Sequence, residues 1–453
     1  MHDLSATITA PATGNQSTAI GIVRISGPDT FSILSRFFPV EKKPDRGIQY
    51  GNFRDNDGQI IDEVVVTCFP GPHSYTRQDT AEVSCHGSPY IVEKILGFLC
   101  EAGAVLALPG EFTYRAYING RMDLAQAEAV TDLIYASSSA QHRIALNQLK
   151  GNVSRDIDQL RQQLIDFASL IELELDFGEE DVEFADREAL LNLVDQAIGH
   201  ISGLIESFEL GNAIKKGIPV AIIGEPNAGK STLLNALLDE NRAIVSNIPG
   251  TTRDAIEDVI NINGILFRLI DTAGIRETGD EIEAEGVKRA LNVIKKARIK
   301  LFIIDVTKTS PEEVIRMAQQ YRLDDQETIL VINKIDLNPK ADTGSFKIAG
   351  QSLAISASGG INIDNLKDLL YHTVMEDDLQ EDAVILSNMR HKEAFQKARQ
   401  DLQRVREGLV NGIPPDLVAM DIRQALYNIG TITGKISADD LLDSIFSRFC
   451  IGK

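Results

Sequence analysis

Apolar residues follow different spacings in successive parts of the chain. Near the N-terminus, short runs rich in β-branched residues, at 19–25, 63–69 and 81–85, alternate with turn residues, and a helix is expected at 89–102. From Asp123 the apolar positions recur at helical spacing, with one glycine between Arg121 and Phe177. The first pattern predicts a mixed α+β domain, and the second predicts long helices.

A third pattern begins near Gly217, where strand-length apolar runs alternate with helical stretches. The predicted strands are 219–223, 265–270, 301–306, 328–333 and 353–356. Strands that alternate with helices favour a mainly parallel sheet covered on both faces. After about residue 376 the helical pattern returns, at 421–429 and 438–449. We therefore predict a multidomain α+β fold, in which an α/β unit is inserted into a split all-α domain.

The predicted domains follow from these changes of pattern. They are an N-terminal α+β domain at 1–118, a first helical part at 119–215, the inserted α/β domain at 216–378 and a second helical part at 379–453. The length of 453 residues suits two to four domains of ordinary size.

Charge and aromatic content restrict the nucleic-acid partners that the chain could have. With 66 acidic and 45 basic residues, the net charge is -21. Sequence-independent binding along a phosphate backbone depends on clustered Lys and Arg, so an RNA partner would have to meet a local basic patch or a particular shape. Tryptophan is absent and aromatics make up 6%, which argues against a broad stacking platform for single strands.

Several absences suggest a cytoplasmic protein without a membrane partner. The sequence has no apolar run of roughly 18 residues, and residues 1–4 do not begin a secretory signal. Cysteines stand at 68, 85, 100 and 450 without a C-x-x-C pair, which indicates reduced thiols. Nine carboxylates crowd 172–188. A solvated loop or helix face is favoured there over a metal site, because no compact ligand spacing stands out.

Residues 224–231, Gly-Glu-Pro-Asn-Ala-Gly-Lys-Ser, match G-x-x-x-x-G-K-[ST] between a predicted strand and a predicted helix. In such a loop, glycines let the backbone wrap a phosphate, and amide N–H groups at the helix N-terminus face the anion. Lys230 would reach the β- and γ-phosphate oxygens, and the Ser231 hydroxyl would bind Mg²⁺. The segment predicts a nucleoside triphosphate site.

Three further motifs each follow a predicted strand: Asp271-Thr272-Ala273-Gly274, Asn333-Lys334-Ile335-Asp336 and Ser356-Ala357-Ser358. Asp271 can hold Mg²⁺ through water, and the Gly274 amide can sense a γ-phosphate. Asp336 can accept two hydrogen bonds from guanine that adenine does not offer. Each motif is weak alone, but all four in this order predict a GTPase, with its site at the carboxyl edge of the sheet.

The sequence leaves the attacking water without an evident partner. Many small GTPases place Gln after the D-x-x-G motif, whereas this chain has Ile275, which cannot hydrogen-bond through its side chain. Either the site is slow alone, or something supplied on contact between G domains completes it. The hydroxyl-rich loop 250–254 offers Thr252 as a second Mg²⁺ ligand.

The chain resembles the tRNA-modification GTPase family MnmE, also called TrmE, nearly from end to end. Besides the GTPase motifs, the resemblance rests on Asp3–Ala10, 20–27, 109–113, 119–128 and the terminal Cys450-Ile451-Gly452-Lys453. It implies an N-terminal folate-binding and dimerising domain, a split helical domain and an inserted P-loop G domain. It also implies a homodimer in which K⁺ stimulates GTP hydrolysis by bringing the two G domains together.

The resemblance further implies a partner and a reaction. Members of the family work with MnmG (GidA), which uses FAD and NADH, to place an aminomethyl or carboxymethylaminomethyl group at C5 of the wobble uridine of certain tRNAs. The one-carbon carrier is a tetrahydrofolate derivative, 5-formyl- or 5,10-methylene-tetrahydrofolate.

Matching positions give the expected ligands of the GTPase site. Mg²⁺ would be held by Ser231 and Thr252, and K⁺ by Asn227, Ser246, the carbonyl of Ile248 and Thr251. The full set expected to contact GTP is Asn227, Ala228, Gly229, Lys230, Ser231, Thr232, Ser246, Asn247, Ile248, Pro249, Gly250, Thr251, Thr252, Asp271, Thr272, Ala273, Gly274, Asn333, Lys334, Asp336, Ser356, Ala357 and Ser358. The chain has Ser358 where a basic residue often follows Ser-Ala, which leaves Asp336 and backbone groups to read guanine.

The resemblance also assigns catalytic and folate-binding residues. Glu283 matches the residue that orients the attacking water indirectly, although without the match it would be a solvated carboxylate in the acidic run 280–283. It joins Lys230 and Cys450 as a candidate catalytic residue, with Cys450 either a reactive thiol or a structural cysteine. The folate contacts would be Arg24, Glu82, Arg121 and Lys453.

Two other functions compete with tRNA modification. A regulatory GTPase that acts as a ribosome-assembly or binding switch would explain 217–376 alone, and the terminal motif and the 110–128 block argue against it. A folate-dependent one-carbon enzyme, gated by GTP, would need neither tRNA nor a partner protein.

Overall fold

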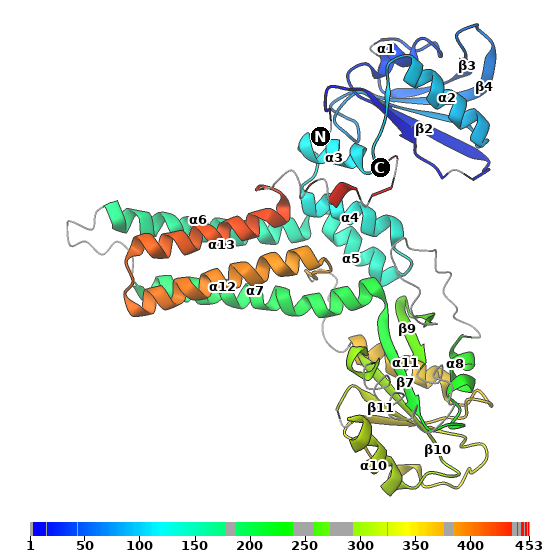
Figure 1. Cartoon of the computed structure of the whole chain (residues 1–453), viewed down its shortest axis with the longest axis vertical. Helices are drawn as coiled ribbons and strands as arrows, with labels where there is room; N and C mark the ends of the chain where they lie inside the picture. Colours follow the sequence, from blue (N-terminus) through cyan, green and yellow to red (C-terminus); the bar gives the residue numbers. More distant parts are fainter. Residues whose placement is uncertain are drawn as a thin grey trace, which may run out of the picture. The chain divides into compact units, whose positions relative to one another are not determined.

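The computed structural model describes residues 3–14, 16–42, 44–176, 187–238, 257–271, 293–323, 325–375, 384–436, 442, 445–447, 449–450 and 452 (Figure 1). It divides into two compact units. The first comprises Met1–Thr131, Gln148–Val194 and Gln400–Lys453, and the second comprises Asp132–Asn147 and Asp195–Arg399. Each unit has its own six-stranded sheet. The predicted multidomain α+β organisation is confirmed, while the four predicted domain boundaries stay predictions.

The N-terminal sheet has the strand order β3-β4-β5-β2-β1-β6. Its strands are β1 (Ile8–Pro11), β2 (Ile20–Ser26), β3 (Gly47–Arg54), β4 (Ile60–Phe69), β5 (Thr80–His86) and β6 (Val105–Leu106), with the short helix α1 (Thr30–Leu34) between β2 and β3. Neighbouring strands are antiparallel, except that β1 and β6 are parallel.

Alternation along β2 decides which of its side chains face the core. Val23 and Ile25 are fully buried in one hydrophobic cluster with Ile95 and Leu99 of α2 (Pro89–Glu101). Because successive side chains of a strand point to opposite faces, Arg24 lies on the other face of the sheet. The burial pattern of the strand therefore places the predicted folate residue away from the core.

The first unit also contains α3 (Glu111–Ile118), α6 (Asn152–Asp176) and α13 (Pro415–Thr433), with the first part of α4 (Leu124–Tyr135). Of these helices, α3 packs against both the sheet and the C-terminal residues. Helices α6 and α13 lie side by side (Figure 1). Phe446 and Phe449 pack with Leu124 and Ala127 of α4, and the Tyr114 ring meets Phe446 edge-on at 5.2 Å.

The helices α5 (Ser139–Leu149) and α7 (Arg187–Lys216) belong mainly to the second unit. The helix α12 (Met389–Asn411) is divided between the two units at Arg399. The Lys392 ammonium lies 4.5 Å from the centroid of the Phe208 ring and pairs with Glu209, which ties α12 to α7. Among the residues that the structure describes, no helix is both long enough and apolar enough to span a bilayer.

The second sheet has the strand order β12-β11-β10-β7-β9-β8. Its strands are β7 (Ile218–Gly224), β8 (Glu257–Ile262), β9 (Ile265–Asp271), β10 (Ile299–Asp305), β11 (Thr328–Asn333) and β12 (Gln351–Ala354). All pairs are parallel except the β8–β9 hairpin. The mainly parallel sheet is confirmed. The last predicted strand, 353–356, is found two residues earlier, at Gln351–Ala354, and Ser356 forms only an isolated bridge with Ile361.

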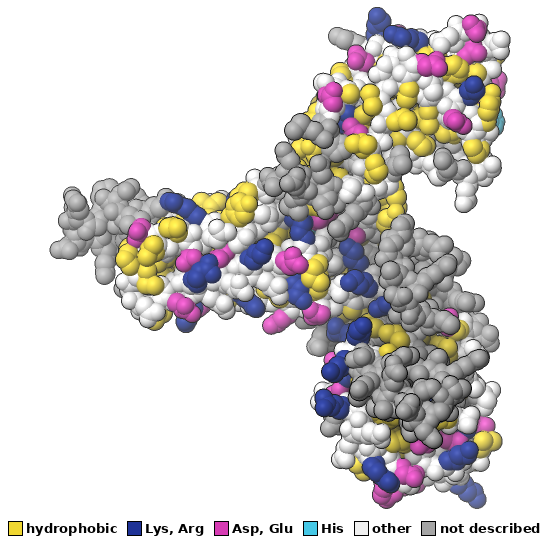
Figure 2. All heavy atoms as spheres, viewed as in Figure 1, with side chains coloured by type: hydrophobic (Ala, Val, Ile, Leu, Met, Phe, Trp, Pro, Cys, Tyr) yellow, Lys and Arg dark blue, Asp and Glu magenta, His cyan; other side chains and the backbone are white. Residues whose placement is uncertain are grey.

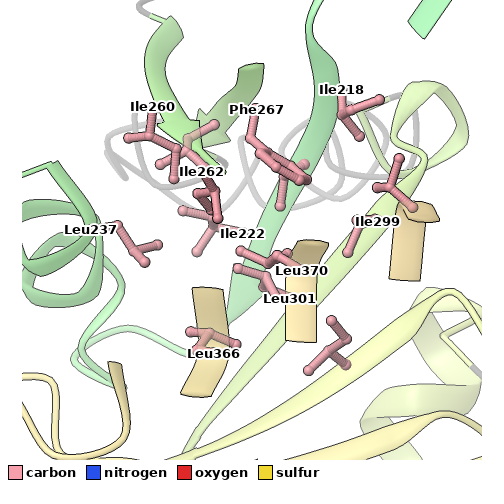
Figure 3. Close-up of a cluster of buried hydrophobic side chains, with 14 of the residues drawn as sticks. Ile218, Ile222, Leu237, Ile260, Ile262, Phe267, Ile299, Leu301, Leu366 and Leu370 are labelled. Atoms are coloured by element: carbon pink, nitrogen blue, oxygen red, sulfur yellow. The ribbon is translucent and has the colours of Figure 1, made fainter. Parts of the chain in front are cut away.

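Helices cover both faces of this sheet, which explains its continuous apolar strands. Ile218 and Ile222 of β7 belong to a buried cluster with Leu237 of α8 (Lys230–Leu238) and Leu366 of α11 (Ile363–Met375), as Figure 3 shows. Ala221 and Ile223 alternate with them, in a second cluster that includes Val314 and Ala318 of α10 (Pro311–Tyr321). Strands buried on both faces need apolar residues at every position.

Truncation of a side chain in the first of these clusters should destabilise the unit. Phe267 is fully buried, so Phe267→Ala is expected to lower the free energy of unfolding by about 3–5 kcal/mol through lost contacts and the resulting cavity. Urea unfolding of the full chain, followed by circular dichroism, measures the change. The control Ile315→Ala removes a half-exposed side chain of α10 and should shift the stability by only about 0.5 kcal/mol. Equal effects of the two variants would contradict the packing described.

Candidate functional sites

The loop between β7 and α8 wraps around its own lysine. The Nζ of Lys230 donates to the carbonyl oxygens of Gly224 at 2.7 Å and Glu225 at 2.8 Å. Asn227 and Gly229 adopt positive φ angles of 66° and 103°, which turn the backbone tightly. Lys230, Ser231 and Thr232 begin α8, and both hydroxyl residues are exposed. This strand–loop–helix geometry suits the cradle for phosphate groups that the sequence predicts.

Asn333 joins the phosphate loop to the loop after β12. This residue ends β11 and is buried; its Nδ2 donates to the carbonyl of Ala228 at 2.9 Å, and its Oδ1 accepts from the amide of Ala357 at 3.0 Å. A Cβ atom at position 229 would lie 2.2 Å from that Nδ2, so the second glycine of the motif is needed for close packing. The first and the last of the four predicted motif loops are thus held together by the carboxamide of Asn333.

Lys334 makes a second connection to the phosphate loop. Its Nζ donates to the carbonyl of Asn227 at 2.8 Å and to Oδ2 of Asp305 at 2.7 Å. Asp336, two residues further, is exposed and available to a ligand. In the last loop, the Ser356 hydroxyl accepts from the amide of Gly359 at 3.0 Å, and Ser358 is exposed. The structure therefore brings three of the four predicted motif loops, those of Lys230, Asn333 and Ser356, to one edge of the sheet.

Asp305 is a charged group of this edge that the sequence analysis did not select. Burial by itself would raise its pKa, but hydrogen bonds from Lys334 and Thr307 outweigh burial and hold the pKa below the ordinary value. The carboxylate is therefore ionised at neutral pH. An acidic residue near the end of the predicted apolar strand 301–306 was the signal that could have indicated it.

Other predicted nucleotide and catalytic residues lie outside the described residues. They are Ser246, Asn247, Ile248, Pro249, Gly250, Thr251, Thr252, Thr272, Ala273, Gly274 and Glu283, together with Ile275. The backbone of Asp271 ends β9, where it pairs with Ile222 of β7. That register places Asp271 at the same sheet edge as the phosphate loop. The assignment of these residues remains a prediction.

In the first unit, Arg24 and Glu82 lie directly opposite each other on β2 and β5. The Nε and Nη2 of Arg24 lie 2.9 Å and 2.8 Å from the same oxygen, Oε1 of Glu82. The Nη1 of Arg24 donates to the carbonyl of Gly452 at 2.9 Å. The guanidinium therefore joins the sheet to the C-terminal motif. The folate assignment of these residues stays a prediction.

Tyr75 brings the third predicted folate residue to the same place. The guanidinium carbons of Arg121 and Arg24 lie 5.1 Å and 5.7 Å from the centroid of its ring. The Tyr75 hydroxyl is 2.9 Å from that of Thr113, and burial raises the pKa of Tyr75. The sequence analysis missed Tyr75, because a single tyrosine before a strand carries no distinctive spacing. The cluster combines cations, an aromatic ring and a carboxylate.

The C-terminal motif is docked on the N-terminal strands. The amide of Gly110 donates to the carbonyl of Cys450 at 3.3 Å, and the Cys450 side chain is half-buried. Gly452 has a φ of 89°, and a Cβ atom there would lie 2.1 Å from the carbonyl oxygen of Pro11. Only glycine suits such a backbone conformation and such a close approach. Lys453 lies outside the described residues.

Comparison with known proteins covers almost the whole chain. The family model of the MnmE helical domain matches residues 124–450, and that of the GTP-binding protein TrmE N-terminus matches residues 7–121. The tRNA modification GTPase MnmE of Cytophaga hutchinsonii is 50% identical over 450 residues, which cover 99% of this chain and 98% of that protein. The protein of the same name from Parabacteroides distasonis is 46% identical over 465 residues and the full length of both.

A solved structure adds little to this comparison. The GTP-binding protein of Sulfolobus solfataricus in complex with GDP is 20% identical, over 48% of this chain and 68% of its own, with a TM-score of 0.27. The assignment rests instead on the family models and on the near-complete alignment with the two relatives. By these matches the chain belongs to the MnmE (TrmE) family of tRNA-modification GTPases.

Proposed function

We propose that this chain hydrolyses GTP in a cycle that K⁺ stimulates and that requires pairing of two G domains. With an MnmG (GidA)-type flavoprotein that uses FAD and NADH, it adds an aminomethyl or carboxymethylaminomethyl group at C5 of the wobble uridine of certain tRNAs. The observation that carries the proposal is the 50% identity to a tRNA modification GTPase MnmE over 99% of the chain. The arrangement of the nucleotide loops supports the GTPase half independently.

The described residues fit a magnesium nucleotide. Phosphates would lie on the amides of the phosphate loop and on Lys230, whose Nζ is already within the curve of that loop. The hydroxyl of Ser231 is an exposed oxygen donor of the kind that Mg²⁺ prefers, with Thr252 as its proposed partner ligand. Bound Mg²⁺ would neutralise charge on the β- and γ-phosphates. Asp336 would read guanine.

Potassium would perform the task of an arginine finger. Asn227 is exposed at the outer turn of the phosphate loop, where its side chain can reach a cation bound beside the phosphates. With Ser246, the Ile248 carbonyl and Thr251, it would form a set of neutral oxygens. Such a set suits a monovalent cation that balances developing negative charge. Glu283 would orient the attacking water indirectly.

The N-terminal cluster fits a reduced folate. The Nε and Nη2 of Arg24 both bind Oε1 of Glu82, and the carboxylate could accept hydrogen bonds from the N–H groups of a pterin through Oε2. Arg121 and Lys453 would suit the anionic tail of the folate. We propose 5-formyl- or 5,10-methylene-tetrahydrofolate as the carrier of the one-carbon unit, which the folate would supply when bound.

Cys450 lies within this neighbourhood through its backbone. Its carbonyl is bonded to Gly110, and the next described residue, Gly452, contacts Arg24. The thiol is therefore carried by a segment that reaches the proposed folate site, which suits a catalytic role as well as a structural one.

The N-terminal domain also suits a homodimer. Ile48 and Tyr50 of the edge strand β3 are each 71% exposed, and Ile60 of β4 is 54% exposed. Figure 2 shows further apolar side chains gathered on the visible face of this domain. An edge strand with apolar side chains favours pairing with a second copy. We place the protein in the cytoplasm, where tRNA and the flavoprotein partner would meet it.

The content of modified wobble uridine in cellular tRNA tests the central proposal. In cells that lack this chain, the wobble-uridine modification should disappear, and Lys230→Ala should fail to restore it because GTP hydrolysis falls on the order of 100-fold. Nucleoside analysis of total tRNA by mass spectrometry measures the modification. The control Lys296→Ala alters an exposed lysine of the same unit and should restore it fully. Normal tRNA nucleosides in the deletion strain would refute the proposed role.

Exchange of the alkali cation tests the hydrolysis mechanism. With Na⁺ in place of K⁺ at equal ionic strength, GTP turnover should fall about tenfold or more, because the smaller ion does not match the proposed oxygen set. Asn227→Ala should lower turnover in K⁺ to the Na⁺ level, whereas the exposed control Asn338→Ala should keep the K⁺ response. Phosphate release measures both effects, and identical rates in the two salts would remove K⁺ from the mechanism.

A neutral residue at position 82 tests the folate site. Glu82→Gln should weaken binding of 5-formyl-tetrahydrofolate about tenfold, since an amide cannot replace a carboxylate that accepts charge-assisted hydrogen bonds. Isothermal titration calorimetry measures the affinity, and GTP hydrolysis should not change. The control is Glu63→Gln, on the neighbouring strand β4, where the carboxylate binds the Tyr50 hydroxyl at 2.8 Å. Equal affinities of both variants would place the folate elsewhere.

A further inference from the structure

Asp305 is a buried carboxylate whose two oxygens are both engaged. It is 4% exposed at the end of β10. Its Oδ1 accepts from the Thr307 amide at 3.0 Å and from the Thr307 hydroxyl at 2.6 Å, and its Oδ2 accepts from the Nζ of Lys334 at 2.7 Å. A carboxylate held at both oxygens has a defined orientation, so the position of the lysine ammonium is defined as well.

The register of the sheet creates this ion pair. Strands β10 and β11 are parallel, with Asp305 opposite Asn333, and the Val306 amide donates to the Asn333 carbonyl at 3.1 Å. Lys334, the first residue after β11, therefore lies beside Asp305. Lys334 has a φ of 66°, in the left-handed region that a side chain with a Cβ atom adopts only when its surroundings hold it there.

Lys334 transmits this fixed position to the phosphate loop. The same Nζ that binds Asp305 donates to the carbonyl of Asn227 at 2.8 Å. A lysine ammonium on a flexible four-carbon stem has no preferred orientation of its own, so the second acceptor decides where it sits. Asp305, Lys334 and Asn227 thus form a continuous line of charge-assisted hydrogen bonds from the sheet edge to the loop.

We propose that Asp305 is a positioning residue of the GTP site, which acts through Lys334 to hold the Asn227 carbonyl and so the phosphate loop in its binding shape. The inference deepens the proposed GTPase function and rests on it. Asp305 contacts no nucleotide in this scheme. Its loss would loosen the loop and speed the dissociation of nucleotide, without removing any group that contacts the ligand.

The same two strands provide a matched control at their opposite ends. Asp325, just before β11, pairs with Lys300 of β10, and this ion pair also lowers the pKa of its carboxyl against the effect of burial. Asp325→Asn therefore breaks an Asp–Lys pair of the same strands, far from the carboxyl edge. If Asp305 had only a structural role, Asp305→Asn and Asp325→Asn would have similar effects on the release of nucleotide.

Release of a fluorescent GDP analogue, mant-GDP, from the full-length protein tests the proposal. Asp305→Asn should speed release about tenfold, the effect of a lost hydrogen bond to a charged group, and Asp325→Asn should change it less than twofold. Lys334→Met should speed release at least as much as Asp305→Asn. The double variant should match Lys334→Met alone, because Asp305 acts only through that lysine.

Thr307→Val gives a milder variant in case Asp305→Asn does not fold. It removes one hydrogen bond to Oδ1 from an exposed residue and should speed release about threefold. The proposal would be overturned if Thr307→Val and Asp305→Asn released mant-GDP no faster than Asp325→Asn does. It would also be overturned if the increases in release rate caused by Asp305→Asn and Lys334→Met multiplied in the double variant. A wild-type protein that fails to bind mant-GDP would overturn the proposed GTPase function, and this inference with it.

Discussion

The buried carboxamide of Asn333 is the interaction on which the nucleotide site depends. It donates to the carbonyl of Ala228 and accepts from the amide of Ala357, so that three loops far apart in sequence share one group. A buried amide left unpaired is costly, so these loops cannot separate without loss of stability. The absence of a side chain at Gly229 makes the contact possible, because a Cβ atom would occupy the space of the amide nitrogen.

Lys334 and Asp305 extend this arrangement with charge. The carboxamide fixes one carbonyl of the phosphate loop, and the ammonium fixes the preceding one, at Asn227. Hydrogen bonds from Lys334 and Thr307 outweigh the desolvation of Asp305, so the carboxylate stays ionised where burial alone would favour the neutral acid. A loop held at two consecutive carbonyls presents its amide groups to a phosphate with little reorganisation.

In the first unit, an arginine side chain joins segments that lie far apart in the sequence. Arg24 binds Glu82 across two strands and the carbonyl of Gly452, so residues separated by most of the chain meet at one guanidinium. Several fixed donors on a planar group allow such a junction, which a lysine could not make with the same geometry. The ring of Tyr75, beneath both Arg24 and Arg121, adds a flat surface that a cation favours.

By itself the sequence determined the local elements and the nucleotide chemistry. Apolar side chains recur every two residues in a strand and every 3.6 residues in a helix, and this repeat depends only on neighbouring residues. The parallel sheet, the long helices and the strand–loop–helix around Lys230 could therefore all be predicted. The order G-x-x-x-x-G-K-S, D-T-A-G, N-K-I-D and S-A-S indicated guanine, because each motif follows a strand and parallel strands share one carboxyl edge. Arg24 and Glu82 were selected only through the family resemblance, since a single charge on a strand has no distinctive spacing.

The tertiary structure alone decided which distant groups meet. Asp305 lies beside Lys334 because of the register of β10 and β11. Tyr75 lies against Arg24 of β2 and against Arg121, which follows α3, because these distant segments meet in the folded unit. The register of the strands and the meeting of distant segments both arise from packing over the whole unit. They decide which charged side chains pair. A residue's partner across the fold therefore cannot be read from its neighbours in the chain, however clearly those neighbours define its strand or helix.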